Sequence, residues 1–201
     1  MKKLDFQDIK GQEHCKRAME VACAGNHGML FIGPHKSGKT YLIKRIPTIT
    51  DIPIFTAEML PCPCGNFTDP KKECRCTPTE IQRYLESTNP EWLAKAEIHI
   101  EVPRLTLCHL SDKRRGESSA DIKARIEKIR QRPTPSEPIL DKEADELLKL
   151  AILELGISAK SYDKIIKVAV TIARLDDKTV VEAHHISEAI SYRSLDRNLW
   201  G

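Results

Sequence analysis

A glycine-rich pattern that follows an apolar run constrains the fold of this chain more than any other feature. The apolar run is Met-Leu-Phe-Ile at positions 29–32, and the eight residues after it are Gly-Pro-His-Lys-Ser-Gly-Lys-Thr. They fit the pattern Gly-x-x-x-x-Gly-Lys-Thr, which joins a strand to a helix and binds nucleotide phosphates. The alternative is a strand-to-helix turn without a ligand. The apolar strand before the pattern and the helix-like residues 41–46 after it favour nucleotide binding.

Each residue type in this loop has a task in phosphate binding. Gly33 and Gly38 permit a turn tight enough for backbone N–H groups to point at phosphate oxygens. Lys39 supplies positive charge to the outer phosphates, and the hydroxyl of Thr40 can ligate Mg²⁺. We therefore expect ATP and Mg²⁺ as cofactors. The predicted nucleotide contacts are Gly33, Pro34, His35, Lys36, Ser37, Gly38, Lys39, Thr40 and Tyr41.

Length and charge exclude several classes of protein. The 201 residues give room for one ordinary domain, or for a compact core with a small second domain. No apolar run approaches the length of a membrane span, and the N-terminus lacks the apolar segment of a secretory signal. We therefore expect a cytoplasmic protein without a membrane partner. The net charge of +3 is too small to indicate nucleic-acid binding by itself.

The hydrophobic pattern predicts strands and helices in the front half of the chain and helices alone in the back half. In the front half we expect helices at 12–24, 41–46 and 77–86 and strands at 29–32, 52–60 and 97–102. Pro47 should end the second helix. In the back half we expect helices at 118–132, 141–155, 158–175 and 182–192, with a proline-rich linker at 132–138. Gly156 is placed to cap the C-terminus of the second of these helices.

Four cysteines form two close pairs, Cys62 with Cys64 and Cys74 with Cys76. Four thiolates in this arrangement fit tetrahedral Zn²⁺ in a closed structural site. The Cys-x-Cys spacing is tighter than the usual Cys-x₂-Cys, so free thiols and redox pairing remain as alternatives. The other three cysteines, which we expect to be small buried apolar residues, are Cys15, Cys23 and Cys108.

Other polar groups are assigned to ordinary structural roles. His184 and His185 are adjacent and should point in different directions on a helix, so we expect surface or helix-start residues rather than a metal pair. His99 should lie on the polar side of a strand, with Glu97 and Glu101. Two basic groups can contact nucleic-acid phosphates, although solvated loops are the simpler interpretation. They are Lys71, Lys72 and Arg75, and Lys113, Arg114 and Arg115.

Several segments form a recognisable series along nearly the whole chain. They are Asp-Phe-Gln-Asp-Ile-Lys-Gly-Gln-Glu at 5–13, the glycine-rich loop, Pro-Cys-Pro-Cys-Gly at 61–65, Glu-Val-Pro-Arg-Leu at 101–105, Arg-Gly-Glu-Ser-Ser at 115–119 and Tyr-Arg-Ser-Leu-Asp-Arg at 192–197. The series resembles the magnesium-chelatase-like AAA+ ATPases, and within them the ComM (YifB) group. The resemblance implies a nucleotide-binding α/β core, a C-terminal helical lid and a ring of ATP-hydrolysing subunits. ComM-like members are implicated in DNA branch migration.

The chain also departs from the family pattern around the catalytic groups. Thr40 and Cys62 are only 22 positions apart, whereas the family has a far longer segment there that carries the Walker B strand and its Asp-Glu pair. A search for an apolar run that ends in Asp-Glu finds only Asp145-Glu146, which lies inside a charged helix, so we expect the water-activating carboxylate to be absent. The other departures are Leu60 for the sensor Asn, Ala94-Lys95 for the Asp-Arg of the arginine finger, Val170 for the sensor arginine of the lid, and His35 and Lys36 for Pro and Gly in the loop.

The loss of several positioning and charge-stabilising groups predicts weak or absent hydrolysis. By resemblance the family sheet has the strand order 5-1-4-3-2, and the retained strands 1, 4 and 5 correspond to 29–32, 54–60 and 98–102. These three are neighbours, so a contiguous parallel sheet remains, with strand 4 as an exposed edge. We predict an α/β fold, with a reduced P-loop AAA+ core at 1–117, its cysteine-rich loop at 61–77 and a helical lid domain at 118–201.

Two functional hypotheses remain. The first is an ATP-binding protein linked to DNA processing or competence, acting within a homo-oligomeric or hetero-oligomeric AAA+ ring and with DNA as a potential partner. The second is a non-catalytic interaction or regulatory remnant that modulates a full-length homologue. A decaying gene is the simpler alternative to both.

Overall fold

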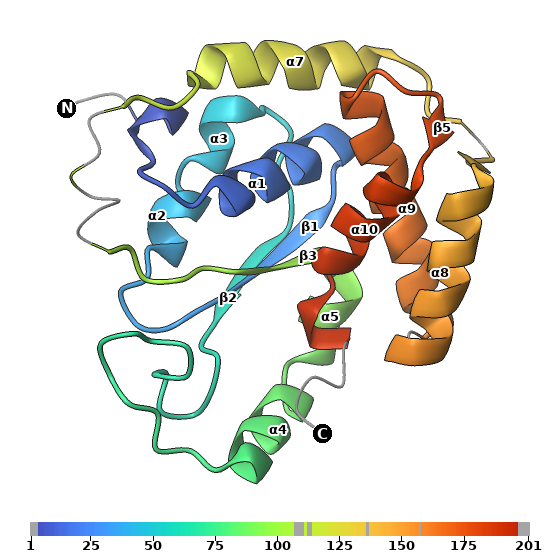
Figure 1. Ribbon diagram of the computed structural model, residues 1–201. Coiled ribbons are helices and arrows are strands. Elements are labelled where there is room, and N and C mark those ends of the chain that lie inside the picture. Colours follow the sequence, from blue (N-terminus) through green and yellow to red (C-terminus); the bar gives the residue numbers. More distant parts are fainter. Residues whose placement is uncertain (1–3, 107–110, 112–113, 136, 157, 197–201) are drawn as a thin grey trace.

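A three-stranded parallel sheet forms the centre of the molecule (Figure 1). The computed structural model describes residues 4–106, 111, 114–135, 137–156 and 158–196. Strand β1 (Gly28–Ile32) lies between β2 (Thr56–Met59) and β3 (Ala96–Glu101), and both pairs are parallel. The predicted set of three neighbouring strands is therefore confirmed. Of the predicted residues, Cys108, Lys113 and Arg197 lie outside the described part of the chain.

The two faces of the sheet pack against different helices because side chains alternate along β1. Met29 and Phe31 belong to a large apolar core with α1 (Glu13–Gly25), whose Cys15 and Cys23 are fully buried as predicted. Leu30 belongs to a smaller cluster on the other face. That cluster includes side chains of α4 (Pro78–Glu86) and α5 (Pro90–Lys95), which begin after the capping residues Thr77 and Asn89.

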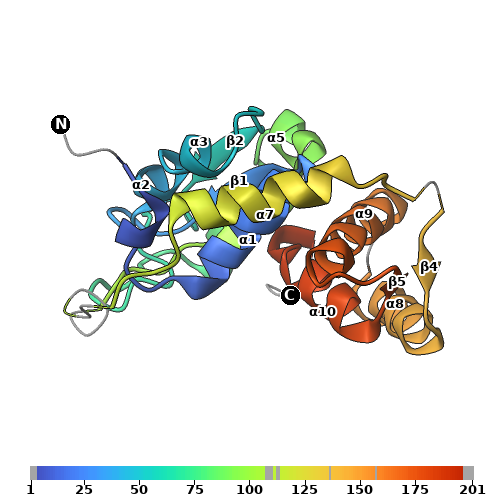
Figure 2. The same cartoon turned by 90° about the horizontal axis from the view of Figure 1, so that it is seen from above.

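A long surface helix, α7 (Ser119–Gln131), lies across α1 (Figure 2). Its Ser118 side chain accepts a hydrogen bond from the backbone N–H of Asp121, which satisfies a free donor of the first turn. The buried side chains Ile122, Ile126 and Ile129 recur at helical spacing and face the core. Helix α7 also contacts α3 (Ile46–Ile49). Helix α7 therefore packs on the front half of the chain, although it follows residue 117, where the sequence predicts a domain boundary. The domain division itself stays a prediction.

The segment after the glycine-rich loop differs from the prediction of one helix ended by Pro47. Two short helices form instead, α2 (Lys39–Ile43) and α3, and Pro47 stands in the first turn of α3. A proline in that turn costs no intrahelical hydrogen bond, because the first N–H groups of a helix have no partner within it. Pro47 therefore starts a helix rather than ending one.

The back half of the chain forms a helical bundle against α1 and β3. Its helices are α8 (Lys142–Leu155), α9 (Ala159–Leu175) and α10 (Ala183–Ser191), with a small parallel pair of strands β4 (Ile139–Leu140) and β5 (Val180–Val181). Gly156 has φ of +63° and ends α8, as predicted. No described helix combines the length and the apolar character that crossing a membrane requires.

The outer edge of β3 is closed by the segment after α10. The backbone N–H of His99 donates to the carbonyl of Tyr192 at 2.7 Å, and Arg193 Nη1 lies 3.0 Å from the carbonyl oxygen of Ala96. His99 therefore lies on a polar side of the strand, as predicted, but Arg193 and the returning chain bury it. Burial and the neighbouring Arg193 hold the pKa of His99 well below its usual range. Strand β2 forms the opposite edge, and no other described strand pairs with its outer side, as predicted.

Candidate nucleotide site and cysteine cluster

The glycine-rich loop lies at the carboxyl end of β1, where the carboxyl ends of β2 and β3 also meet. Its two motif glycines are required for different reasons. Gly38 has φ of +104°, a conformation that side-chain-bearing residues rarely adopt. A Cβ atom on Gly33 would lie 2.4 Å from the carbonyl oxygen of Val102, so the loop can pass the end of β3 only with glycine there.

Lys36 occupies the position where the family has glycine, and its backbone explains that preference. It has φ of +61°, in the left-handed region. A residue with a side chain pays about 1–2 kcal/mol to adopt this conformation. The P-loop keeps its shape with Lys36 in place, but at a conformational cost that glycine would avoid.

The side chain of Lys39 folds back over the loop. Its ammonium donates to the carbonyl oxygens of Gly33 at 2.7 Å and Pro34 at 3.0 Å. Burial lowers the pKa of Lys39, and the nearby carboxylate of Glu58 acts in the opposite direction. The buried hydroxyl of Ser37 has no hydrogen-bond partner among the described residues. The loop thus presents a cation and an unused hydroxyl, both suited to phosphate oxygens.

A cavity of about 640 Å³ opens in front of the loop, within the size range of small-molecule sites. Leu60, the residue predicted to replace the family's sensor Asn, lines this cavity with an apolar side chain. Lys95 and Val170, which stand at the other substituted positions, are not among the lining residues. The cavity is lined by His35, Lys36, Ser37, Gly38, Lys39, Thr40, Tyr41, Glu58, Met59, Leu60, Tyr84 and Trp92.

The N-terminal segment supports the loop from outside the cavity. The amide nitrogen of Gln12 donates to the carbonyl oxygens of Ser37 at 3.2 Å and Pro103 at 3.1 Å. Tyr41 donates its hydroxyl to the carbonyl of Asp8 at 3.1 Å. Gln12 was not predicted as a site residue, and its sequence signal is slight, because a Gly-Gln pair does not by itself indicate a contact with residues so far along the chain.

Glu58 is a candidate functional residue that the sequence analysis did not predict. Thr40 Oγ1 donates to the carboxylate of Glu58, at 3.0 Å from Oε2 and 3.2 Å from Oε1. A search for an apolar run that ends in Asp-Glu passes over a single glutamate inside a strand. Its importance follows only from the pairing of Phe31 with Glu58, which places the acid beside the glycine-rich loop.

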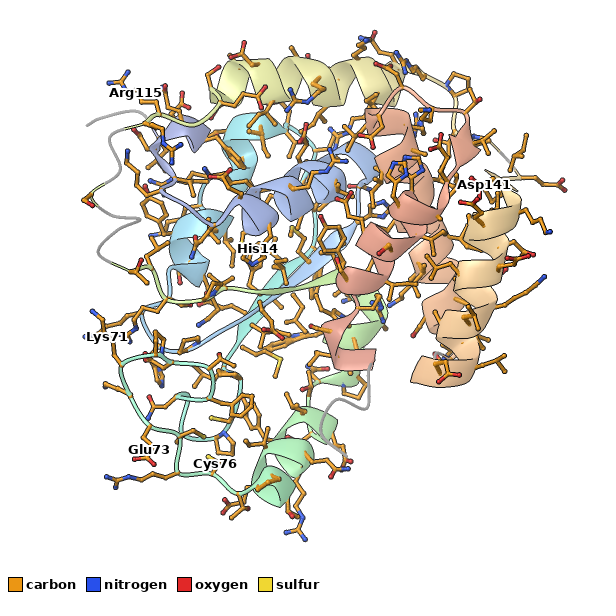
Figure 3. All side chains as sticks on the ribbon, in the orientation of Figure 1. His14, Lys71, Glu73, Cys76, Arg115 and Asp141 are labelled. Carbon is orange, nitrogen blue, oxygen red and sulfur yellow. The ribbon has the colours of Figure 1, made fainter. Side chains whose placement is uncertain are left out.

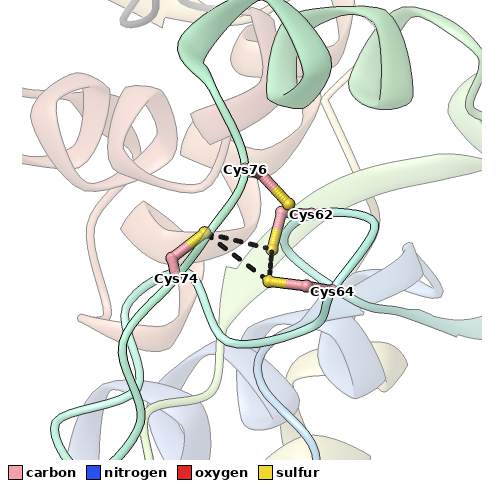
Figure 4. A group of neighbouring side chains, drawn as sticks. All are labelled: Cys62, Cys64, Cys74 and Cys76. Atoms are coloured by element: carbon pink, nitrogen blue, oxygen red, sulfur yellow. Dashed lines mark hydrogen bonds between the residues drawn. The ribbon is translucent and has the colours of Figure 1, made fainter.

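The four cysteines predicted to bind zinc converge on one point (Figure 4). The Sγ atom of Cys62 lies 3.5 Å from that of Cys64 and 3.7 Å from that of Cys74, and the Sγ atoms of Cys64 and Cys74 are 3.6 Å apart. Cys76 joins them, and all four sulfurs lie within 4.8 Å of one another. Sulfurs at about 2.3 Å from a tetrahedral Zn²⁺ are about 3.8 Å apart, so the arrangement fits this ion.

One thiol of the cluster is prepared for deprotonation. Hydrogen bonds from the backbone N–H groups of Arg75 and Asn66 lower the pKa of Cys64 to about 6. The thiolate is the form that binds a metal. The sulfur–sulfur distances are much longer than the roughly 2.05 Å of a disulfide, so redox pairing is not the described state.

The cysteine loop packs directly against the P-loop. Arg104 Nη2 lies 3.0 Å from the buried carboxylate of Asp69, and it donates to the carbonyl of His35 at 2.8 Å. Gly65 has φ of +72°, and a Cβ atom there would lie 2.6 Å from the ring of His35. The conformation of one loop therefore depends on the position of the other.

The adjacent histidines lie in the first turn of α10, as predicted, but the expected direction of their side chains is wrong. His184 and His185 do not point apart, because their ring centroids are 3.8 Å apart, and His185 is fully buried. Both rings approach Asp176. However, His185 Nδ1 accepts the backbone N–H of Glu182 at 2.9 Å, which leaves the proton of the neutral ring on Nε2, the atom that faces Asp176. A protonated nitrogen has no lone pair for a metal, so we assign His185 to capping the helix.

The described basic residues among those considered for nucleic-acid contacts, Lys71, Lys72, Arg75, Arg114 and Arg115, are exposed and do not form one surface. Figure 3 shows Lys71 and Glu73 on the cysteine-rich loop, whereas Arg115 lies at a separate position near the start of α7. The nearby carboxylate of Glu73 also reduces the positive character of the first group. Their role as DNA contacts stays a prediction.

Comparison with known proteins adds a family assignment to this geometry. The family model for the magnesium chelatase subunit ChlI matches residues 5–54 and 51–110, and the model for the C-terminal part of that subunit matches 135–193. The two pieces of the first match adjoin between α3 and β2, the place where the sequence indicates a missing segment.

Individual relatives agree with this assignment. Competence protein ComM of Haemophilus influenzae is 24% identical over 315 positions, which cover 98% of this chain and 61% of the relative. The protein YifB of Escherichia coli is 30% identical over 184 positions, which cover 83% of this chain and 36% of the relative.

The chain is thus much shorter than these relatives, and the 315-position alignment exceeds its 201 residues by more than a hundred. A reduced parallel sheet, a glycine-rich loop at its carboxyl end and a helical C-terminal bundle accompany matches to both family models. The chain is a truncated member of the magnesium chelatase family, related to the ComM and YifB proteins.

Proposed function

We propose that this chain binds ATP with Mg²⁺ at the P-loop and hydrolyses it weakly or not at all. The observation that carries the proposal is the position of Lys39 and Thr40 on the wall of a cavity of about 640 Å³ at the carboxyl end of the sheet. The left-handed Gly38 and the unpartnered hydroxyl of Ser37 fit a loop that wraps around phosphate oxygens.

Different residues of the cavity are proposed to bind the phosphates, the Mg²⁺ ion and the base of the nucleotide. The outer phosphates replace the carbonyl oxygens of Gly33 and Pro34 as partners of the Lys39 ammonium. Thr40 is placed to hold Mg²⁺, which when bound offsets the negative charge of the outer phosphates. Tyr84 and Trp92 line the same cavity and offer aromatic surfaces to a base.

Weak hydrolysis follows from what surrounds the phosphates. Leu60 offers no polar group where the family has its sensor Asn, and Lys95 and Val170 do not line the cavity. Phosphoryl transfer depends on positioned charges and on an oriented water molecule. The removal of even one such group typically costs about a hundredfold or more in rate.

The four converging cysteines are proposed to hold a structural Zn²⁺. A closed set of four thiolates leaves no open position for chemistry, so the ion would stabilise the loop and take no part in a reaction. Through Arg104 and Gly65 the loop braces the P-loop, and zinc would thereby support nucleotide binding.

The cellular role is proposed from the relatives. One of them carries the name competence protein ComM, so we place this chain in DNA processing or competence in the cytoplasm, with a homo-oligomeric or hetero-oligomeric ring and DNA as its partners. The alternative is a regulator of a full-length homologue. No described strand pairs with the outer edge of β2, which favours this alternative because an open strand edge can pair with another chain.

Thermal unfolding with and without ATP tests the binding claim. At an ATP concentration of about 100 times Kd, the wild-type protein should gain roughly 2.7 kcal/mol in stability. The variant Lys39→Ala should gain little, and a surface control, Lys142→Ala on α8, should behave as wild type. Equal unfolding temperatures of the wild-type protein with and without Mg-ATP would contradict the proposal.

A further inference from the structure

We propose that Glu58 supplies the carboxylate that holds the nucleotide's Mg²⁺ beside Thr40, from a strand other than the one that carries this acid in the family. The inference rests on the proposed nucleotide binding and deepens it. Through Glu58, a chain without a Walker B strand would still favour the magnesium complex of ATP over the free nucleotide.

The pairing of β1 and β2 puts Glu58 at the required place. In parallel strands, residues in register share a face of the sheet, and Glu58 is in register with Phe31. Phe31 faces the core that contains α1, α3 and Leu42 of α2. Glu58 therefore lies on the same face as α2, two positions before Leu60, which lines the nucleotide cavity.

The contact itself joins two oxygen ligands of the kind that Mg²⁺ prefers. Thr40 Oγ1 lies 3.0 Å from Oε2 and 3.2 Å from Oε1 of Glu58, so both carboxylate oxygens face the hydroxyl. Mg²⁺ takes oxygen ligands at about 2.0–2.1 Å and is usually held in nucleotide sites by one or two carboxylates together with phosphates. The hydroxyl and the carboxylate are close enough to serve one ion, directly or through its water molecules.

A purely structural role explains the contact less well. Glu58 is exposed, as is Thr40, and a hydrogen bond in solvent contributes little to stability. An exposed glutamate is also unfavourable in a strand. Glu58 lowers the stability of the strand, and its carboxylate has no buried partner among the contacts described. A bound cation would be a strong partner for this carboxylate.

Charge gives Glu58 a selective effect. Lys39 and Glu58 line the same cavity, so the carboxylate offsets part of the positive charge that the loop presents to phosphates. Free ATP would meet the glutamate as a like charge beside the phosphates. The magnesium complex would meet it as a ligand. The glutamate thus makes binding depend on Mg²⁺, and its removal should weaken that dependence rather than abolish binding.

Titration with a fluorescent ATP analogue, in Mg²⁺ and in EDTA, tests the assignment. Wild-type protein should bind about tenfold or more tightly in Mg²⁺. In Glu58→Gln the ratio should fall to about threefold or less, with binding in EDTA equal to or tighter than that of wild type. Glu143→Gln, an exposed acid in the first turn of α8, is the matched control and should keep the wild-type ratio.

Mn²⁺ gives a readout that does not depend on the nucleotide's fluorescence. Its paramagnetic signal, measured with saturating ATP, should report an affinity for Mn²⁺ about tenfold lower in Glu58→Gln. Glu58→Asp, which keeps the charge on a shorter side chain, should recover part of the affinity and guards against a folding defect in the amide variant.

The outcomes separate the two claims. Wild-type protein that fails to bind the analogue in Mg²⁺ overturns the proposed function and the role of Glu58 with it. Wild-type protein that binds, together with Glu58→Gln that keeps both the Mg²⁺ ratio and the Mn²⁺ affinity, overturns the role of Glu58 alone.

Discussion

The two edges of the sheet end in different ways. At β3 the chain closes the edge from within, because backbone and side-chain hydrogen bonds tie His99 and Ala96 to Tyr192 and Arg193. At β2 no described strand continues the sheet, and the residues that follow enter the cysteine-rich loop. The difference is between an edge that the chain pairs with its own later residues and an edge that no described strand covers. Residues 192–193 join β3 to the helical bundle, whereas the outer edge of β2 is unpaired among the described strands and places an acid, Glu58, beside the P-loop.

The largest expected effect comes from opening the β3 edge. Arg193→Ala removes a buried guanidinium that donates to the carbonyl oxygens of Ala96 and Glu97. Buried groups left without partners are costly, so we expect a loss of about 3 kcal/mol in the free energy of unfolding. Urea denaturation measures it. The exposed Arg114→Ala is the control, and equal midpoints for the two variants would contradict the role given to this edge.

Low pH should reduce the stability of the protein on the side of the sheet edge formed by β3, where α9 packs. The residue responsible is His27, which lies between α1 and β1. Its Nε2 is 2.8 Å from Thr171 Oγ1 of α9, and burial lowers the pKa of His27 from 6.5 to about 4. The unfolded chain therefore takes up a proton between these values and the folded chain does not. The stabilisation is complete above pH 6.5 and is lost as the pH falls toward 4.

At pH 5 the expected loss from His27 is about 2 kcal/mol. Urea denaturation of His27→Gln at pH 7 and pH 5 measures this term. The variant can be less stable than wild type at both pH values. However, its free energy of unfolding should fall by about 2 kcal/mol less between pH 7 and pH 5 than that of wild type. An unchanged difference would show that His27 does not titrate in the way we describe.

The β2 side should respond to metal. A zinc chelator, or Cys64→Ser, should remove the proposed ion, loosen residues 62–76 and weaken ATP binding about tenfold, or 1.4 kcal/mol. Metal analysis should find one Zn²⁺ per chain in wild type. Hydrogen exchange should become faster in 62–76 and stay unchanged in β3. Faster exchange in β3 as well would mean that the two edges are not independent.

The smallest expected effect concerns the P-loop itself. Lys36→Gly relieves the left-handed backbone of a residue that has a side chain, and it should stabilise the protein by about 1 kcal/mol. Thermal unfolding without nucleotide measures the gain, and Lys44→Gly, at the C-terminal end of α2, should destabilise instead. A loss of stability in Lys36→Gly would contradict the assigned backbone strain.

The parts of the fold that depend on local sequence were predictable. The glycine-rich loop, the Thr77 cap of α4 and the Gly156 end of α8 each follow from residues within a few positions of one another. The neighbouring strands followed from the family's strand order. Pro47 was misassigned because the same residue can end one helix or begin the next.

The parts that depend on distant contacts were not predictable. His99 alternates with apolar residues as a solvated strand residue would, and only the return of residues 192–193 buries it. Glu58 and Thr40 are 18 positions apart, and their contact requires the pairing of β1 with β2. The same holds for Arg104 and Asp69, whose ion pair joins two loops that share no motif.

The central claim is that this chain holds ATP without turning it over. The most direct test is calorimetric titration with Mg-ATP, followed by phosphate release measured on the same sample, for wild type and Lys39→Ala. We predict saturable binding of one nucleotide per wild-type chain, no binding by Lys39→Ala, and phosphate release that is equal in the two. Phosphate release by the wild-type protein well above that of Lys39→Ala, or no binding by the wild-type protein, would contradict the account.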